Sequence, residues 1–156
     1  MKGWKLSDGR RECYYGELPN WRRYYLPPFP LGGKTVLDVG AGEGESAAFF
    51  LSHGAARVVC IERDRKCMHN LYTNAKRNPI TVVAEPFQLN HLMIPHHFAK
   101  IDIEGWEEIL LQVKPCDLKP TVVEVHGQPL MARFARLGWR YLTPPVTTAC
   151  YMSNWK

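Results

Sequence analysis

The chain has 156 residues, 46% of them hydrophobic and 22% charged, a composition typical of one globular domain. No apolar run approaches the roughly 18 residues of a membrane span, and no signal-peptide pattern opens the chain, so we expect a cytoplasmic protein without a membrane partner. The five cysteines are irregularly spaced and form no C-x-x-C pair, which argues against a structural zinc site.

The net charge of +5 is concentrated near the N-terminus. Residues 1–34 contain seven basic and three acidic side chains, and aromatic residues alternate with the basic ones, most densely in 21–25. A Pro- and Gly-rich stretch over 26–33 follows. We therefore predict an N-terminal basic and aromatic arm or lid over 1–33 and a main domain over 34–156.

Three interpretations of the arm stay open at this point. Interleaved Arg and aromatic side chains suit a nucleic-acid surface, where rings stack on bases and Arg contacts phosphate. The same aromatic residues suit a lid that shapes a small-molecule pocket. The third interpretation is an arm that packs its rings on the sheet and leaves its charges in water.

After the arm, strand-like and helix-like segments alternate. The predicted strands are 35–39, 57–61, 80–84, one within 97–103, 121–126, 138–142 and 147–152. The predicted helices are 43–52, 64–77, 104–113 and 129–137, the second with Asp64 as its N-cap. This alternation predicts an α/β fold, a Rossmann-like doubly wound and mainly parallel sheet that binds its ligand beyond the carboxyl ends of the strands.

A glycine-rich turn follows the first predicted strand. Gly40, Gly42 and Gly44 form a G-x-G-x-G run, which permits a tight turn and close approach of a ligand to the backbone. A dinucleotide site would have a glycine where this chain has Glu45, and its pyrophosphate would meet acidic side chains. The turn therefore favours a cationic ligand such as S-adenosylmethionine.

Acidic residues end the next two predicted strands. Glu62 occupies the position at which nucleoside-binding sheets place a carboxylate against ribose hydroxyls. Glu85 follows the third strand and is placed to face an adenine edge, with Phe87 against the ring. The candidate cofactor-binding residues are Asp38, Gly40, Ala41, Gly42, Glu43, Glu62, Arg63, Glu85, Phe87 and Asp102.

The run from Asp38 to Gly44 resembles motif I of class I S-adenosylmethionine-dependent methyltransferases. Three further stretches resemble the FkbM-type branch, namely K-I-D-I-E-G-W-E over 100–107, V-V-E-V-H over 122–126 and N-L-Y-T-N over 70–74. The resemblance implies a seven-stranded sheet with the last strand antiparallel. It also implies methyl transfer from S-adenosylmethionine, often to a hydroxyl oxygen.

The catalytic candidates are His126, Glu124 and Glu104, at the ends of the predicted fourth and fifth strands. His126 is the candidate base, because imidazole titrates near neutral pH, and Glu124 or Glu104 is placed to orient it. Residues two apart in a strand share a face, so Glu124 and His126 should point the same way. Together with Asp102, a divalent-metal site is an alternative interpretation, although we assign no metal ligand.

Three hypotheses for function follow. The first is a methyltransferase acting on a hydroxyl of a small-molecule or sugar-like acceptor. The second is an RNA or protein methyltransferase that uses the basic aromatic arm. The third is an inactive cofactor-binding partner subunit. The sequence does not fix the oligomeric state.

Overall fold

The computed structural model describes Trp4 and residues 21–144 and 148–155. Seven strands form one sheet in the order β3-β2-β1-β4-β5-β7-β6. The strands are β1 (Thr35–Val39), β2 (Arg57–Ile61), β3 (Ile80–Val83), β4 (Phe98–Ile101), β5 (Thr121–His126), β6 (Arg140–Tyr141) and β7 (Ala149–Ser153). The helices are α2 (Glu45–Ser52), α3 (Arg65–Ala75) and α4 (Gln128–Arg136), with short 3₁₀ turns η1 (Leu89–Met93), η2 (Glu107–Gln112) and η3 (Pro115–Asp117).

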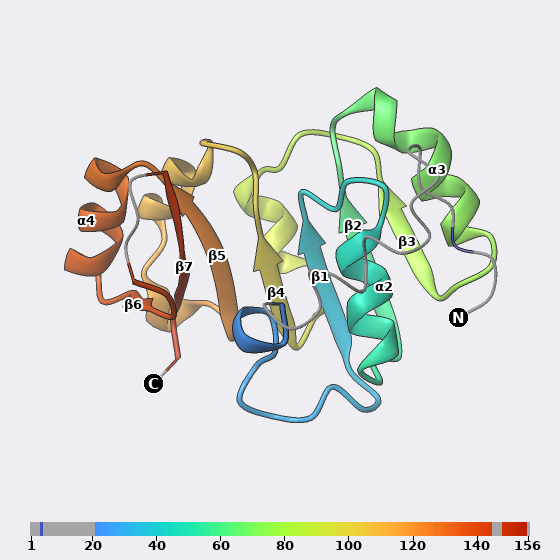
Figure 1. Ribbon diagram of the computed structural model, residues 1–156, viewed down its shortest axis with the longest axis horizontal. Helices are drawn as coiled ribbons and strands as arrows, with labels where there is room; N and C mark the ends of the chain where they lie inside the picture. Colours follow the sequence, from blue (N-terminus) through green and yellow to red (C-terminus); the bar gives the residue numbers. More distant parts are fainter. Residues whose placement is uncertain (1–3, 5–20, 145–147, 156) are drawn as a thin grey trace.

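Strands β1 to β5 pair with one another in parallel, and β7 is antiparallel to both β5 and β6. This topology confirms the predicted fold class, including the antiparallel last strand. Figure 1 shows the carboxyl ends of β1, β4 and β5 at the same edge of the sheet. No helix within the described residues is long and apolar enough to cross a membrane.

The central strands β1, β2, β4 and β5 are buried on both faces, as in covered parallel sheets. Successive residues of β1 belong to the two cores: Val36 belongs to the core that includes Phe49 of α2, and Leu37 belongs to the core that includes Phe134 of α4. Figure 1 shows α2 lying over β1 and β2, with α4 beyond β5 and β7. The two cores hold the strands in register, and that register fixes which side chains meet at the carboxyl edge.

Most element boundaries lie within a few residues of the prediction, and the exceptions have local causes. Asp64 caps α3 as predicted, with its Oδ1 accepting a hydrogen bond from the Lys66 N–H at 2.9 Å. The predicted helix over 104–113 is wrong. Glu104 and Gly105 have φ angles of 53° and 93°, which a right-handed helix does not allow, so only the 3₁₀ turn η2 forms there.

Residues 21–31 pack against the same face of the sheet as α2. Residues 21–24 are helical, and Tyr25 and Leu31 belong to the core on that face. The Tyr24 ring stacks on Tyr151 of β7 at a centroid distance of 4.7 Å. In this described part, the arm therefore covers the sheet with its rings. Residues 1–3 and 5–20 lie outside the described part, and the division of the chain at residue 34 stays a prediction.

Candidate functional site

A cavity of about 610 Å³ lies at the carboxyl edge of the sheet, beyond β1, β2 and β4. Its volume is that of a site for a small molecule or cofactor. The lining residues are Val39, Gly40, Gly42, Ile61, Glu62, Arg63, Asp64, Cys67, Glu85, Pro86, Phe87, Asp102, Ile103, Glu104, Trp106 and Ile109. Seven of the ten predicted cofactor-binding residues are among them.

The glycine-rich turn forms the wall of the cavity beside β1. Gly40 has a φ of 70°, and a Cβ at this position would lie 1.6 Å from the backbone oxygen of Asp102. The Gly40 N–H donates to the Ile61 carbonyl at 2.9 Å, which ties the turn to β2. Gly40 is therefore required both by its backbone conformation and by the close approach of the segment after β4.

Glu62 connects this turn to the start of α3. Its Oε2 accepts a hydrogen bond from the Gly42 N–H at 2.8 Å, and its Oε1 accepts from the N–H groups of Arg63 and Asp64, each at 2.7 Å. A carboxylate oxygen has two lone pairs, so Oε1 is fully used and Oε2 can accept one more hydrogen bond. Glu62 thus presents one acceptor position at the cavity, which suits a hydroxyl group.

Asp38 is not among the residues that line the cavity, and its predicted contact with a ligand stays a prediction. The side chain is fully buried behind the turn, where Oδ2 accepts from Ser46 Oγ at 2.6 Å and Oδ1 lies 3.4 Å from Lys100 Nζ. Burial raises the pKa of this carboxyl, and Lys100 only partly offsets that rise. Because Lys100 also donates to the Gly40 carbonyl at 2.8 Å, this pair supports the turn from within the core.

Ala41 and Glu43 are also predicted cofactor contacts that do not line the cavity. Both are buried, and the Glu43 carbonyl accepts a hydrogen bond from Asn74 of α3 at 2.9 Å. These two residues fix the turn against α3. The acidic charges that the sequence places around a ligand therefore lie partly behind the turn, whereas Glu62 and Asp102 line the cavity beside it.

Arg63, Glu85 and Phe87 line the cavity, as the predicted placement requires. Glu85 is half-exposed, and its Oε1 lies 2.7 Å from Nε2 of the buried His91. The guanidinium of Arg63 lies 5.2 Å from the ring centroid of Trp106, within cation–π range. Sequence reasoning did not assign a role to Trp106, which is 64% exposed beside the cavity.

His126 lies at the end of β5, beside the cavity residues Asp102 and Glu104. Its Nδ1 is 3.1 Å from Oε1 of Glu107, and its Nε2 is 3.7 Å from Oε2 of Glu104. Burial alone would lower the pKa of His126, but Glu107, Glu124 and Glu104 raise it, and the net shift is upward. The imidazole is therefore held between two carboxylates.

Glu107 orients His126, and it is a residue that sequence reasoning missed. Its carboxylate is fully buried, accepts the Gly105 N–H at 3.0 Å and has no hydrogen-bond partner for Oε2 among the described residues. Glu107 is the last residue of the K-I-D-I-E-G-W-E stretch. The signal available in the sequence was an acidic residue two positions after Gly105. This spacing alone does not show that the Glu107 side chain turns back toward β5.

Glu124 contacts a different residue from His126, and its predicted role in orienting His126 stays a prediction. It is the cross-strand partner of Tyr151 on β7, and the two side chains form a hydrogen bond. Burial, followed by the negative charge of Asp102, raises the pKa of Glu124 to about 7. Glu124 belongs to a buried polar group with Tyr151 and Tyr25 on the face that the arm covers.

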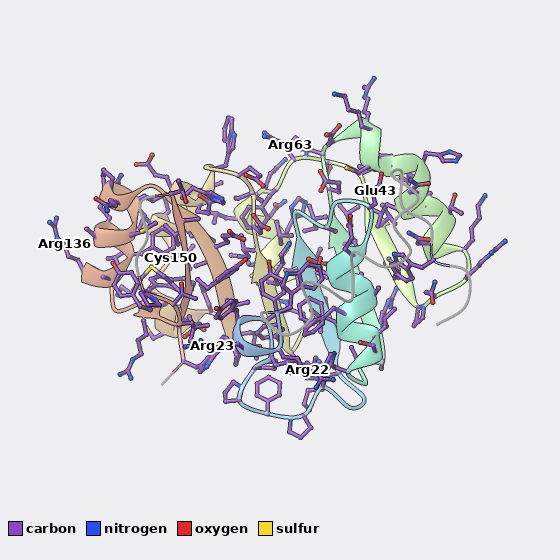
Figure 2. All side chains as sticks on the ribbon, viewed as in Figure 1. Arg22, Arg23, Glu43, Arg63, Arg136 and Cys150 are labelled. Atoms are coloured by element: carbon purple, nitrogen blue, oxygen red, sulfur yellow. The ribbon has the colours of Figure 1, made fainter. Side chains whose placement is uncertain are left out.

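Arg22 and Arg23 lie away from the cavity. Figure 2 shows both at the edge of the sheet opposite to Arg63, which stands at the carboxyl edge. Both side chains are exposed, in keeping with an arm that leaves its charges in water. Arg22 and Arg23 therefore do not cover the cavity.

Comparisons with known proteins show which proteins this chain resembles in sequence and in fold. No family model matches the chain. It is 36% identical over 89 residues to ribosomal protein L11 methyltransferase of Aquifex aeolicus, a match that covers 53% of this chain and 35% of that protein. It is 48% identical over 42 residues to ribosomal RNA small subunit methyltransferase A of Xanthobacter autotrophicus, covering 27% of this chain and 15% of that one. The chain spans about a third or less of the length of these relatives.

A solved structure covers more of the chain. Fibrillarin of Aeropyrum pernix, in complex with natively bound S-adenosyl-L-methionine, superposes with a TM-score of 0.63 at 14% identity, over 88% of this chain and 73% of that one. The chain has the fold of the class I methyltransferases. Within this fold, its assignment to the FkbM-type branch stays a prediction.

Proposed function

We propose that this chain transfers a methyl group from S-adenosylmethionine to an acceptor in RNA. The observation that carries the methyl donor is Glu62, which the turn and the start of α3 hold at the cavity with one acceptor position left on Oε2. A ribose hydroxyl is the group that this position suits. The fold of the class I methyltransferases supports the same donor.

The other lining residues fit the rest of this cofactor. Ile61, Phe87 and Ile109 provide apolar surface for an adenine ring, and Glu85 provides an acceptor for its amino group. S-adenosylmethionine supplies a methyl group on a positively charged sulfur, which is already activated for displacement. The protein has to hold the acceptor in line with that carbon, because positioning accounts for much of the acceleration in such a reaction.

The relatives favour a macromolecular acceptor over the small molecule that we expected from the sequence. Their names refer to ribosomal RNA and to a ribosomal protein. Beside the cavity, Trp106 and Arg63 together offer an exposed ring and a guanidinium, and bases of single-stranded RNA stack on such groups. Arg65 and Lys66 are exposed next to Arg63 and suit the phosphate backbone.

A ribosomal protein is the second candidate acceptor. The observation that favours it is the length of the match to the L11 methyltransferase, 89 residues against 42 for the RNA methyltransferase. The stacking surface at Trp106 is the reason to prefer RNA as the acceptor.

We also propose a role for His126. It activates the acceptor, and Glu107 is its positioning residue.

Calorimetry with the full chain tests the donor. Glu62→Gln keeps the size of the side chain but replaces a charged acceptor, so we expect S-adenosylmethionine to bind at least about tenfold more weakly. Glu108→Gln is the matched control, because Glu108 is exposed and pairs with Arg133 away from the cavity. Equal affinity of wild type and Glu62→Gln, or binding of NAD instead, would contradict the proposed donor.

Transfer of a labelled methyl group tests the acceptor. Small-subunit ribosomal RNA and total ribosomal protein are offered separately, and we expect label in the RNA. Trp106→Ala should raise the KM for RNA by a larger factor than it weakens binding of S-adenosylmethionine, because Trp106 is the exposed ring at the edge of the cavity. Label in ribosomal protein alone would replace RNA by the second candidate, and label in neither would leave only a cofactor-binding subunit.

A further inference from the structure

Three side chains with metal-ligating atoms meet where β4 and β5 end. Asp102, Glu104 and His126 each offer one ligand atom, and these atoms all lie within 4.8 Å of one another. Parallel pairing of β4 with β5 brings them together, because Asp102 follows β4 directly and His126 is the last residue of β5. Two carboxylates and one imidazole form a donor set that divalent cations use.

Glu107 supplies an independent observation at the same place. Its fully buried carboxylate contacts Nδ1 of His126, so Nε2 is the nitrogen that faces Glu104. Metal-binding histidines are held in this way, with a carboxylate on the nitrogen that does not bind the metal. The Oε2 atom of Glu107 and the Oδ1 atom of Asp102 are both buried without a hydrogen-bond partner among the described residues.

The local charges leave an excess of negative charge. Asp102, Glu104 and Glu107 surround His126, and the nearest buried cation is Lys100, at 3.6 Å from Asp102 and 3.4 Å from Asp38. The positive charge of Lys100 is therefore divided between Asp102 and Asp38. Of these carboxylates Glu107 is fully buried, and a buried carboxylate without enough positive charge nearby is costly to keep ionised. A divalent cation beside His126 would reduce this cost.

We propose that Asp102, Glu104 and His126 bind a divalent cation of the Mg²⁺ or Mn²⁺ class, with Glu107 as the positioning residue. Three protein ligands leave coordination positions open to water or to an acceptor oxygen. The role of the cation rests on the proposed function: it binds a hydroxyl of the acceptor and lowers the pKa of that hydroxyl. The hydroxyl proton passes to solvent, the oxygen forms a bond to the methyl carbon, and the bond from this carbon to sulfur breaks with its electron pair on sulfur.

This proposal narrows the acceptor to an oxygen atom. A hard cation held by carboxylates binds a hydroxyl in preference to a ring nitrogen. Methylated RNA digested to nucleosides should then carry the methyl group on a ribose hydroxyl and not on a base.

Mn²⁺ binding to the full chain, followed by electron paramagnetic resonance without S-adenosylmethionine or RNA, tests the site itself. We expect one site, weakened at least tenfold in Asp102→Asn and in His126→Ala. Glu107→Gln should weaken it about 10- to 100-fold, as loss of a carboxylate behind a metal-binding histidine does. Glu108→Gln, an exposed acid next in sequence to Glu107, should bind Mn²⁺ as the wild type does.

The metal site and the proposed function fail separately. Mn²⁺ binding that is absent, or equal in all four variants, overturns the metal site and leaves His126 with Glu107 as a base alone. Loss of methyl transfer in EDTA, restored by Mn²⁺ while S-adenosylmethionine stays bound throughout, supports the catalytic role of the cation. Specific Mn²⁺ binding without any affinity for S-adenosylmethionine would overturn the proposed function and keep the metal site.

Discussion

Glu107 and His126 contact each other at the carboxyl edge of the sheet, with Oε1 of the carboxylate 3.1 Å from Nδ1 of the imidazole. The carboxylate is fully buried, whereas the imidazole is partly exposed toward Glu104. A buried negative charge at this distance stabilises the protonated imidazole and fixes the ring orientation. The pair therefore sets both the direction and the protonation of His126.

Replacing Glu107 by Gln should lower the pKa of His126. The negative charges of Glu107 and its neighbours hold this pKa above its usual value against the effect of burial, so removing the closest charge shifts it downward. Titration of the imidazole by NMR in the presence of EDTA measures the shift. His96, whose pKa burial lowers in the loop before β4, is an internal reference that should not change. An unchanged His126 titration in Glu107→Gln would show that the contact does not control its charge.

Replacing Gly40 by Ala should destabilise the fold by about 2–4 kcal/mol, because the φ of 70° is strained for Ala and the new Cβ meets the Asp102 carbonyl. Gly32→Ala is the matched control, since a Cβ there has nothing within 4 Å and its φ is not in the left-handed region. This control should change the free energy of unfolding by less than about 0.5 kcal/mol. Urea unfolding of both variants measures the difference, and equal values would rule out close approach as the reason for Gly40.

The sequence predicts those parts of the site that depend on one strand and the turn after it. Glu62 could be placed because an acid at the end of a parallel strand faces the ligand edge, whatever the rest of the fold does. The same holds for Gly40 and for the cap at Asp64. Local patterns specify these positions, so a correct strand assignment is sufficient to find them.

Contacts between distant segments are the part that could not be predicted. The position of Asp38 at the end of a strand predicts a ligand contact. In the structure its carboxylate pairs with Lys100, which lies 62 residues later in the chain. Glu124 and His126 share a strand face, yet Tyr151 and Glu107 take them as separate partners. The left-handed backbone at Glu104 and Gly105 interrupts the first turn of the predicted helix over 104–113, and the residue type of Glu104 does not signal a positive φ.

Replacing Lys100 by Met should destabilise the fold by about 3–5 kcal/mol, because it leaves the fully buried Asp38 without its cation. The double variant Lys100→Met with Asp38→Asn removes both charges, and its amide can still accept from Ser46. We expect the double variant to recover part of the loss. Urea unfolding of the two single variants and the double variant gives the coupling energy. Additive losses, with no recovery in the double variant, would contradict the pairing of these two residues in the core.

Replacing Glu124 by Gln should change how stability depends on pH. Burial and Asp102 raise the pKa of Glu124 from its usual value near 4.5 to about 7 in the folded chain. Because the folded state holds this proton more tightly than the unfolded state, the contribution of Glu124 is most favourable below pH 4.5. It is lost progressively as pH rises from about 4.5 to 7. Gln is neutral at all pH values and keeps an oxygen for the hydrogen bond from Tyr151, so the variant lacks this loss.

The difference between wild type and Glu124→Gln should therefore grow with pH. Urea unfolding at pH 5 and at pH 8 is the measurement, and we expect the variant to gain about 1–2 kcal/mol relative to the wild type over this interval, after discounting for the half-buried position of the side chain. Glu108→Gln is again the control, because its exposed carboxylate pairs only at the surface with Arg133 and should show no comparable trend. Parallel stability curves for wild type and Glu124→Gln would mean that Glu124 titrates in the folded chain as it does in the unfolded one.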